Sequence, residues 1–179
     1  MSDDAIQRRK FLSGVAAVPI AAGAQSKPMA GKMPLAIGCD HAGFPLKGPV
    51  IALLKSWGHS VTDCGTFSDA PVDFPDIAQK VCAEVLSGKA QRGVLVCGTG
   101  VGACIAGNKV RGIRAALCHD TYSAHQCVEH DDVNLLCVGA WIIGVKVAEE
   151  VLRAYVNANF STDEDFRRRV RKLGEMEKR

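Results

Sequence analysis

Short, continuously apolar runs alternate with longer amphipathic segments from Pro34 to the end of the chain, and no other feature restricts the fold as strongly. Short apolar runs between turn residues are typical of strands buried on both faces of a parallel sheet. The longer segments have the spacing of helices that connect such strands. The alternation predicts an α/β fold: a three-layer, doubly wound, Rossmann-like sandwich around a five-stranded parallel sheet. We expect strands at 35–39, 60–65, 92–98, 113–120 and 134–139, and helices at 45–58, 76–88, 102–110, 121–131, 144–158 and 162–179.

The charge is distributed unevenly along the 179 residues. The net charge is +3, and all of it lies in residues 1–32, which hold five basic and two acidic side chains. Residues 33–179 therefore carry no net charge. This balance argues against nucleic acid as a partner, because nucleic-acid-binding surfaces are basic. A local exception is the basic run Phe166–Lys172.

The N-terminal segment has the three parts of an export signal. Arg8 and Arg9 begin a charged stretch, a modest apolar run follows, and Ala22-Gly23-Ala24 fits a cleavage site. The arginine pair resembles a twin-arginine signal, and the apolar run is too short to remain as a stable membrane span. We expect residues 1–32 to be an export signal and linker that sends the domain at 33–179 to the periplasm. A cytoplasmic protein is the alternative.

One strand-to-helix connection brings a cysteine and three glycines together. Cys97 ends an apolar run, and Gly98, Gly100 and Gly102 follow it at alternate positions. The backbone amides of such a loop, at the start of a helix, suit an oxyanion or a phosphate. The same field lowers the pKa of a neighbouring thiol, so we expect Cys97 to be a thiolate near neutral pH. A tight turn beside a buried structural thiol is the alternative.

The same loop permits a different ligand. The spacing Gly98-x-Gly100-x-x-Ala103, with Asp120 at the end of the next strand, also fits a dinucleotide-binding fingerprint. That fingerprint normally follows the first strand of its fold, whereas this loop follows the third, and a lone glycine pattern is weak.

Other polar residues follow the predicted strands, where ligands of doubly wound sheets bind. His41 and His130 are candidates for acid–base or anion-binding work. His59 follows Gly58 at a helix end and is expected to be a solvated turn residue. A metal site is conceivable but lacks the tight spacing of known ligand sets. Its ligands would come from Cys39, Asp40, His41, Cys118 and His119.

Five separate stretches together resemble one enzyme family. They are GCDHAGF at 38–44, VDFPDIA at 72–78, VCGTGVGACIAGNKVRGIRAALCHD at 96–120, YSAHQCVEHDDVN at 122–134 and RRV at 168–170. From about Pro34 onward, the chain resembles the ribose-5-phosphate isomerase B / galactose-6-phosphate isomerase family.

The resemblance implies an aldose–ketose isomerase that works through an enediol without a metal or other cofactor. It also implies a homodimer or tetramer whose active sites are shared between subunits. In this reading Cys97 moves the proton between C1 and C2, Thr99 assists, and His130 opens the sugar ring. The remaining implied contacts are the amides of Gly98, Gly100 and Gly102 to the enediolate, Asp40 and His41 to the sugar, and Arg169 to the phosphate.

Four positions depart from the family pattern. Asp131 replaces an asparagine that contacts the sugar, Phe74 replaces a tyrosine, and Trp141 and Asp165 replace arginines that hold phosphate. Tryptophan offers no bidentate contact, and a carboxylate repels a phosphate dianion. With the export signal, these departures predict an isomerase of a sugar without phosphate. The alternatives are an ordinary ribose 5-phosphate isomerase and a non-catalytic periplasmic sugar-binding module.

Overall fold

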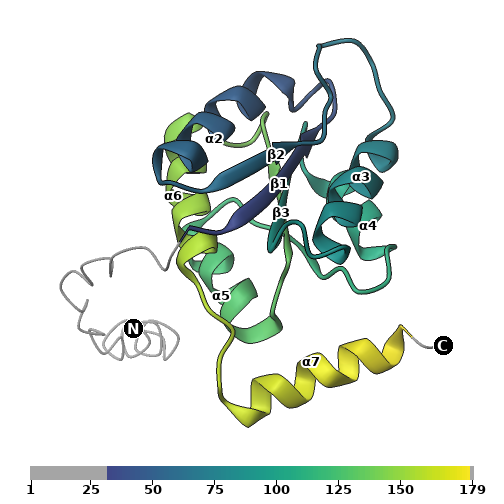
Figure 1. The fold of residues 1–179 in the computed structure, drawn as a ribbon, viewed down its shortest axis with the longest axis vertical. Coiled ribbons are helices and arrows are strands. Elements are labelled where there is room, and N and C mark those ends of the chain that lie inside the picture. The colour runs from purple at the N-terminus through teal and green to yellow at the C-terminus, as the bar shows by residue number, and fades with distance from the viewer. Residues whose placement is uncertain (1–31, 178–179) are drawn as a thin grey trace, which may run out of the picture.

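The computed structural model describes residues 32–177, and these form the expected three-layer sandwich (Figure 1). Five strands pair in parallel in the order β2-β1-β3-β5-β4. The strands are β1 Pro34–Cys39, β2 Ser60–Asp63, β3 Arg92–Cys97, β4 Ala115–Leu117 and β5 Leu135–Gly139. The helices are α2 Phe44–Ser56, α3 Phe74–Leu86, α4 Val101–Asn108, α5 Thr121–Asp131, α6 Val145–Asn157 and α7 Glu164–Met176.

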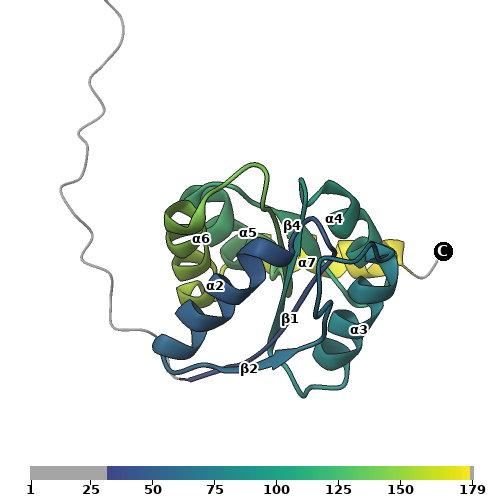
Figure 2. The ribbon, with the colours of Figure 1, turned by 90° about the horizontal axis from the view of Figure 1, so that it is seen from above.

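The two faces of the sheet carry different helices. Helices α2, α5 and α6 cover one face, and α3 and α4 cover the other (Figure 2). Alternate residues of the central strand β3 supply both cores: Val94 and Val96 pack toward the first set of helices, and Leu95 packs toward the second. Both faces of this strand are covered, which explains the unbroken apolar run from Gly93 to Cys97.

The edge strand β2 does not follow this pattern. Ser60, Thr62 and Asp63 are exposed and Val61 is only half-buried, so the expectation of full coverage is wrong for this strand. Its polar residues are consistent with an edge position, where polar and charged side chains discourage pairing with another sheet.

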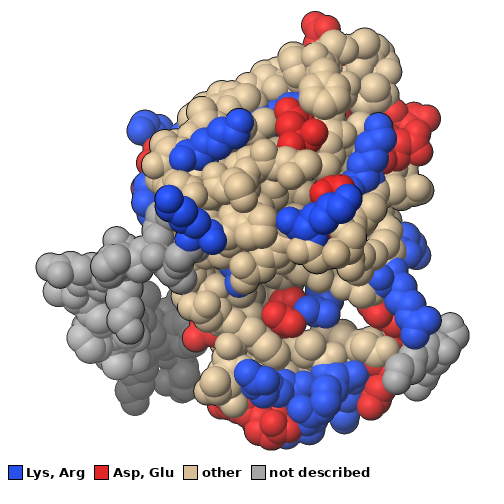
Figure 3. All heavy atoms as spheres, in the orientation of Figure 1, with Lys and Arg blue, Asp and Glu red and all other residues tan. Residues whose placement is uncertain are grey.

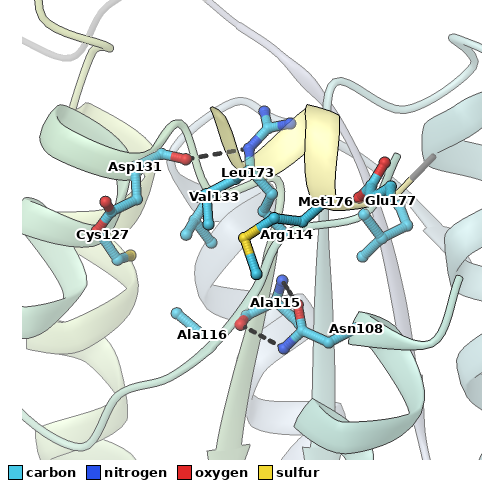
Figure 4. Close-up of a pocket in the computed structure, with 11 residues that line it drawn as sticks. Asn108, Arg114, Ala115, Ala116, Cys127, Asp131, Val133, Leu173, Met176 and Glu177 are labelled. Atoms are coloured by element: carbon cyan, nitrogen blue, oxygen red, sulfur yellow. Dashed lines mark hydrogen bonds between the residues drawn. The ribbon is translucent and has the colours of Figure 1, made fainter. Parts of the chain in front are cut away.

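Helix α7 stands apart from the sandwich. It lies across the edge where the strands begin, and none of its residues is buried (Figure 1). A pocket of about 500 Å3 separates it from the body, with Leu173 and Met176 on the helix side (Figure 4). The predicted export signal lies almost wholly outside the described residues. Within residues 32–177, no helix combines the length and apolar character needed to cross a bilayer.

The expectation that His59 is solvated is wrong. The turn after α2 places its ring beneath the segment that enters β1, where it is 5% exposed. Its Nδ1 accepts a hydrogen bond from the Met33 amide at 3.2 Å, and its Nε2 is buried without a partner. Burial lowers the pKa of His59 below its ordinary value of 6.5, so the folded chain holds this ring neutral.

This burial predicts destabilisation in mild acid. As the pH falls below about 6.5, His59 becomes protonated in the unfolded chain but stays neutral in the folded chain. Because the unfolded chain then binds more protons, the free energy of unfolding decreases. His59→Asn keeps a side-chain acceptor near Met33 but cannot titrate. We expect a smaller decrease for this variant between pH 7 and pH 5.5 in urea unfolding. Parallel decreases in the two proteins would contradict the assignment.

Candidate active site

The loops that follow β1, β3 and β5 meet at one edge of the sheet. In the parallel register Cys39 lies beside Val96, and Cys97 lies beside Gly139. Asp40 therefore follows β1 directly next to Cys97. The loop after β5 is tied to the loop after β3, because the Ala140 amide donates to the Cys97 carbonyl at 2.8 Å.

The glycine loop is packed between two aromatic rings. A Cβ atom at Gly98 would lie 2.8 Å from the Trp141 ring, and one at Gly102 would lie 2.9 Å from the Phe74 ring. Gly100 caps α4 with a φ of 81°, the left-handed conformation that side chains disfavour. Trp141 is 72% exposed. The loop thus presents its backbone between two rings, one of which is open to solvent.

Cys97 differs from the sequence-based expectation in its protonation. Burial raises the pKa of its thiol, and a hydrogen bond with the Asp40 carboxylate raises it further. Hydrogen bonds from the amides of Gly100 and Gly98 oppose this and lower the pKa, but the net direction is upward. The predicted resting thiolate is therefore wrong: the loop amides do act on the sulfur, but desolvation and a neighbouring carboxylate outweigh them.

The other residues predicted for this edge are held by short local bonds. Asp40 is 6% exposed, and its Oδ1 accepts from the Gly43 amide at 2.8 Å. His41 Nδ1 accepts from the Val72 amide at 3.4 Å, which links this residue to the loop that leads into Phe74. Thr99 Oγ1 accepts from the amide two residues later at 3.4 Å. The structure brings these predicted residues to one edge: Asp40, His41, Phe74, Cys97, Gly98, Thr99, Gly100, Gly102 and Trp141.

Three predicted site residues lie at the opposite edge. Helix α5 runs antiparallel to β4, so its last residue, Asp131, lies near the start of that strand. At this end, Arg114 Nε donates to the Asp131 carbonyl at 3.0 Å. His130, in the last turn of α5, and Arg169, on α7, share this edge with Asp131. The six residues of the central strand β3, which separate the two edges, span roughly 20 Å at about 3.3 Å per residue. Within one chain, His130, Asp131 and Arg169 are therefore not part of the Cys97 cluster.

Asp120, considered for dinucleotide binding, and His119, considered as a metal ligand, both hydrogen-bond to other residues of the fold. The Asp120 carboxylate caps α5: its oxygens accept from the Ser123 amide at 2.8 Å and from the Ser123 hydroxyl at 2.6 Å. His119 Nε2 accepts from the Gly139 amide at 2.9 Å and so supports the end of β5, a role that no sequence signal indicated. Among residues 32–177, no group of three or more His, Cys, Asp or Glu side chains is arranged to hold a metal ion.

Comparisons with known proteins decide the family. A protein-family model described as "Ribose/Galactose Isomerase" matches residues 35–173. The chain belongs to this family. The ribose/galactose isomerase family resemblance, the Rossmann-like fold and the isomerase class predicted from the sequence are therefore confirmed.

Relatives of this isomerase are named for several sugars. Ribose-5-phosphate isomerase B of Escherichia coli (strain K12) is 41% identical over 126 residues, which cover 70% of this chain and 85% of that one. The 4-deoxy-4-sulfo-D-erythrose isomerase of Clostridium sp. (strain MSTE9) is 38% identical over 130 residues, covering 72% and 82%. The structure of Clostridium thermocellum ribose-5-phosphate isomerase B has a TM-score of 0.79 and 42% identity, covering 82% and 98%.

The contact between Asp40 and Cys97 predicts how the thiol titrates. Because the carboxylate favours the protonated sulfur, Asp40→Asn should lower the pKa of Cys97, while the asparagine Oδ1 still accepts from the Gly43 amide. The pH dependence of iodoacetamide alkylation, followed at Cys97 by peptide mass spectrometry, should move to lower pH. Asp120→Asn, at the same edge but engaged in a helix cap, is the matched control. Equal shifts in both variants would contradict a specific contact.

Proposed function

We propose that this isomerase interconverts an aldose and a ketose through an enediol, with Cys97 moving the carbon-bound proton. The surroundings of Cys97 support this role. Asp40 follows β1 beside Cys97 in the strand register, and its carboxylate raises the pKa of the thiol, whereas the amides of Gly98 and Gly100 lower it. The thiol thus has a neighbouring acceptor for its own proton, and the amides stabilise negative charge on the sulfur or on a nearby substrate oxygen.

The protons of the reaction balance at named atoms. Asp40 accepts the thiol proton of Cys97, and the thiolate then removes the proton from C2 of the aldose. The charge that develops on the oxygen at C1 is held by the amides of the glycine loop, Gly98, Gly100 and Gly102. The Thr99 hydroxyl moves a proton from the oxygen at C2 to the oxygen at C1. Cys97 delivers its proton to C1, and Asp40 returns the thiol proton.

A complete site needs a second copy of the chain. The loops around Cys97, residues 40–43, 64–73, 98–100, 118–120 and 140–144, contain no lysine or arginine. Lys47 of α2 reaches one of these loops at the Thr66 carbonyl, but it is paired with Asp63. Several lysine and arginine side chains lie on α7, at the bottom of the view (Figure 3). We infer a homodimer or tetramer in which the partner subunit's His130 opens the sugar ring at this chain's Cys97. The partner subunit's Asp131 and Arg169 approach the same substrate.

The charges around this site favour a sugar without phosphate. The loops at the Cys97 edge carry four carboxylates, at Asp40, Asp69, Asp73 and Asp120. On α7, Asp165 stands where the family resemblance implies an arginine. Its Oδ1 forms an ion pair with Arg168 at 2.6 Å, which partly neutralises that arginine. The exposed Trp141 ring offers an apolar face of the kind that stacks on sugars. We infer a free aldose or ketose, or a related uncharged derivative, as substrate.

Location and substrate support each other in this proposal. We infer that residues 1–32 direct the domain at 33–179 to the periplasm, where sugar phosphates are scarce. A relative named for a sulfo-sugar indicates that the family also includes enzymes named for substrates other than phosphates. Cell fractionation distinguishes the periplasm from the cytoplasmic alternative, and Arg8→Lys with Arg9→Lys should keep the protein inside the cell.

The reaction predicts carbon-bound deuterium exchange. In heavy water, NMR should detect deuterium at C2 of a free aldose together with ketose formation, and Cys97→Ala should lower this rate at least about a hundredfold, as loss of a proton-transfer group does. Ribose 5-phosphate is tested as a substrate in the same assay. Exchange with the phosphate alone would reject the change of substrate. Binding of sugars without any exchange would indicate a sugar-binding module.

Sharing of the site predicts complementation between two inactive chains. A heterodimer of Cys97→Ala and His130→Asn chains, isolated through two different tags, has one site with Cys97 and the partner subunit's His130 both intact. It should recover about half the activity of the wild-type dimer, because a two-fold dimer has two equivalent sites. Activity no greater than that of either parent variant would place His130 outside the partner's site.

A further inference from the structure

The Phe166 side chain lies between His130 and Arg169, two residues that are proposed to act in the active site of the partner subunit. The rings of His130 and Phe166 are stacked, with centroids 3.9 Å apart and planes 13° from parallel. The guanidinium carbon of Arg169 lies 5.5 Å from the centroid of the same Phe166 ring. Phe166 thus joins a histidine at the end of α5 to an arginine on α7.

Within the described part of the chain, polar contacts do not fix the His130 ring. Neither ring nitrogen makes a hydrogen bond among residues 32–177, and the recorded ion pair is with Glu129 Oε2, 3.9 Å from Nε2. That carboxylate oxygen lies closer to His125 Nε2, at 3.3 Å. The side chain of His130 is 30% exposed. The stack on Phe166 therefore sets the plane of the imidazole, and both nitrogens stay available to a substrate.

The stack also holds α7 in place. This helix has no buried residue, and it contacts α5. The chain just before it is tied to α5 by the Ser161 amide, which donates to the Glu129 carbonyl at 2.9 Å. Other arginines of α7 have other partners: Arg167 lies 5.1 Å from the Phe160 ring, and Arg168 pairs with Asp165. Arg169 is thus the α7 arginine that shares an aromatic contact with His130.

We propose that Phe166 is a positioning residue that presents His130 and Arg169 as one unit to the active site of the partner subunit. This inference rests on the proposed function. Stacking fixes the plane of the imidazole, and the guanidinium contact fixes the arginine relative to that plane. A flexible side chain at this position would leave both groups free to rotate before they meet a substrate, which lowers the effectiveness of a positioned acid–base group.

The first test compares three variants in the deuterium-exchange assay. Phe166→Leu should lower the exchange rate about tenfold, a part of the 10²–10⁴ that a positioned acid–base group contributes. Phe166→Tyr keeps the ring and should retain the rate. Phe160→Leu, which removes the ring next to Arg167, is the matched control on the same segment and should also retain it. Equal losses in Phe166→Leu and Phe166→Tyr, or none in Phe166→Leu, would overturn the proposal.

Two heterodimers separate positioning from general damage. Paired with Cys97→Ala, a Phe166→Leu chain supplies Cys97 and the other chain supplies an intact His130 and Phe166, so this mixed dimer should recover about half the wild-type rate. Paired with His130→Asn, the Phe166→Leu chain must supply His130 itself, and the rate should stay low. Equal recovery in both heterodimers would show that Phe166 does not act through His130.

A spectroscopic measurement is independent of catalysis. The protons of the His130 ring should shift in the NMR spectrum of Phe166→Leu, because the ring current of the stacked phenyl group is lost, and Phe160→Leu should leave them in place. Unchanged resonances would overturn the proposal even if no sugar is turned over. Inactivity of the wild-type chain, or failure of Cys97→Ala and His130→Asn to complement, would instead overturn the proposed function.

Discussion

The pairing of β3 with both β1 and β5 is the constraint on which the rest of the molecule depends. It buries a strand that is apolar from Gly93 to Cys97 and aligns the ends of three strands within one register. Because of that alignment, Asp40, Cys97 and Trp141 lie side by side although they are far apart in the sequence. The chemistry of the site is thus set by backbone pairing before any substrate-binding side chain is considered.

A second consequence is that two opposite edges of the sheet carry the predicted site residues. The edge where the strands end holds a thiol, carboxylates and loop amides, and its loops contain no lysine or arginine. The edge where they begin holds His130 and Arg169, joined through Phe166. The predicted site residues are thus divided between the two edges of one chain. In a two-fold assembly that brings unlike edges together, one kind of contact completes both sites.

The strands, the helices and the cluster around Cys97 could be predicted from the sequence, because apolar periodicity and the strand-end rule depend on local pattern. The environment of individual side chains could not. His59 is buried by the segment that enters β1, and the pKa of Cys97 is raised by burial and by a carboxylate from another strand. The stack of His130 on Phe166 joins residues on different helices and leaves no periodic signal. These are tertiary contacts, which override local propensity.

The raised pKa of Cys97 fits the proposed export better than the predicted thiolate would. Thiolates are the forms that oxidants attack, so a permanently ionised Cys97 in an oxidising compartment would be lost to sulfenic acid or to a mixed disulfide. Burial and Asp40 keep the sulfur protonated at rest, and the loop amides favour its ionised form. The cysteines of the described residues are all free thiols. Under the proposed mechanism, a base that forms only when a substrate is present would combine proton transfer with resistance to oxidation.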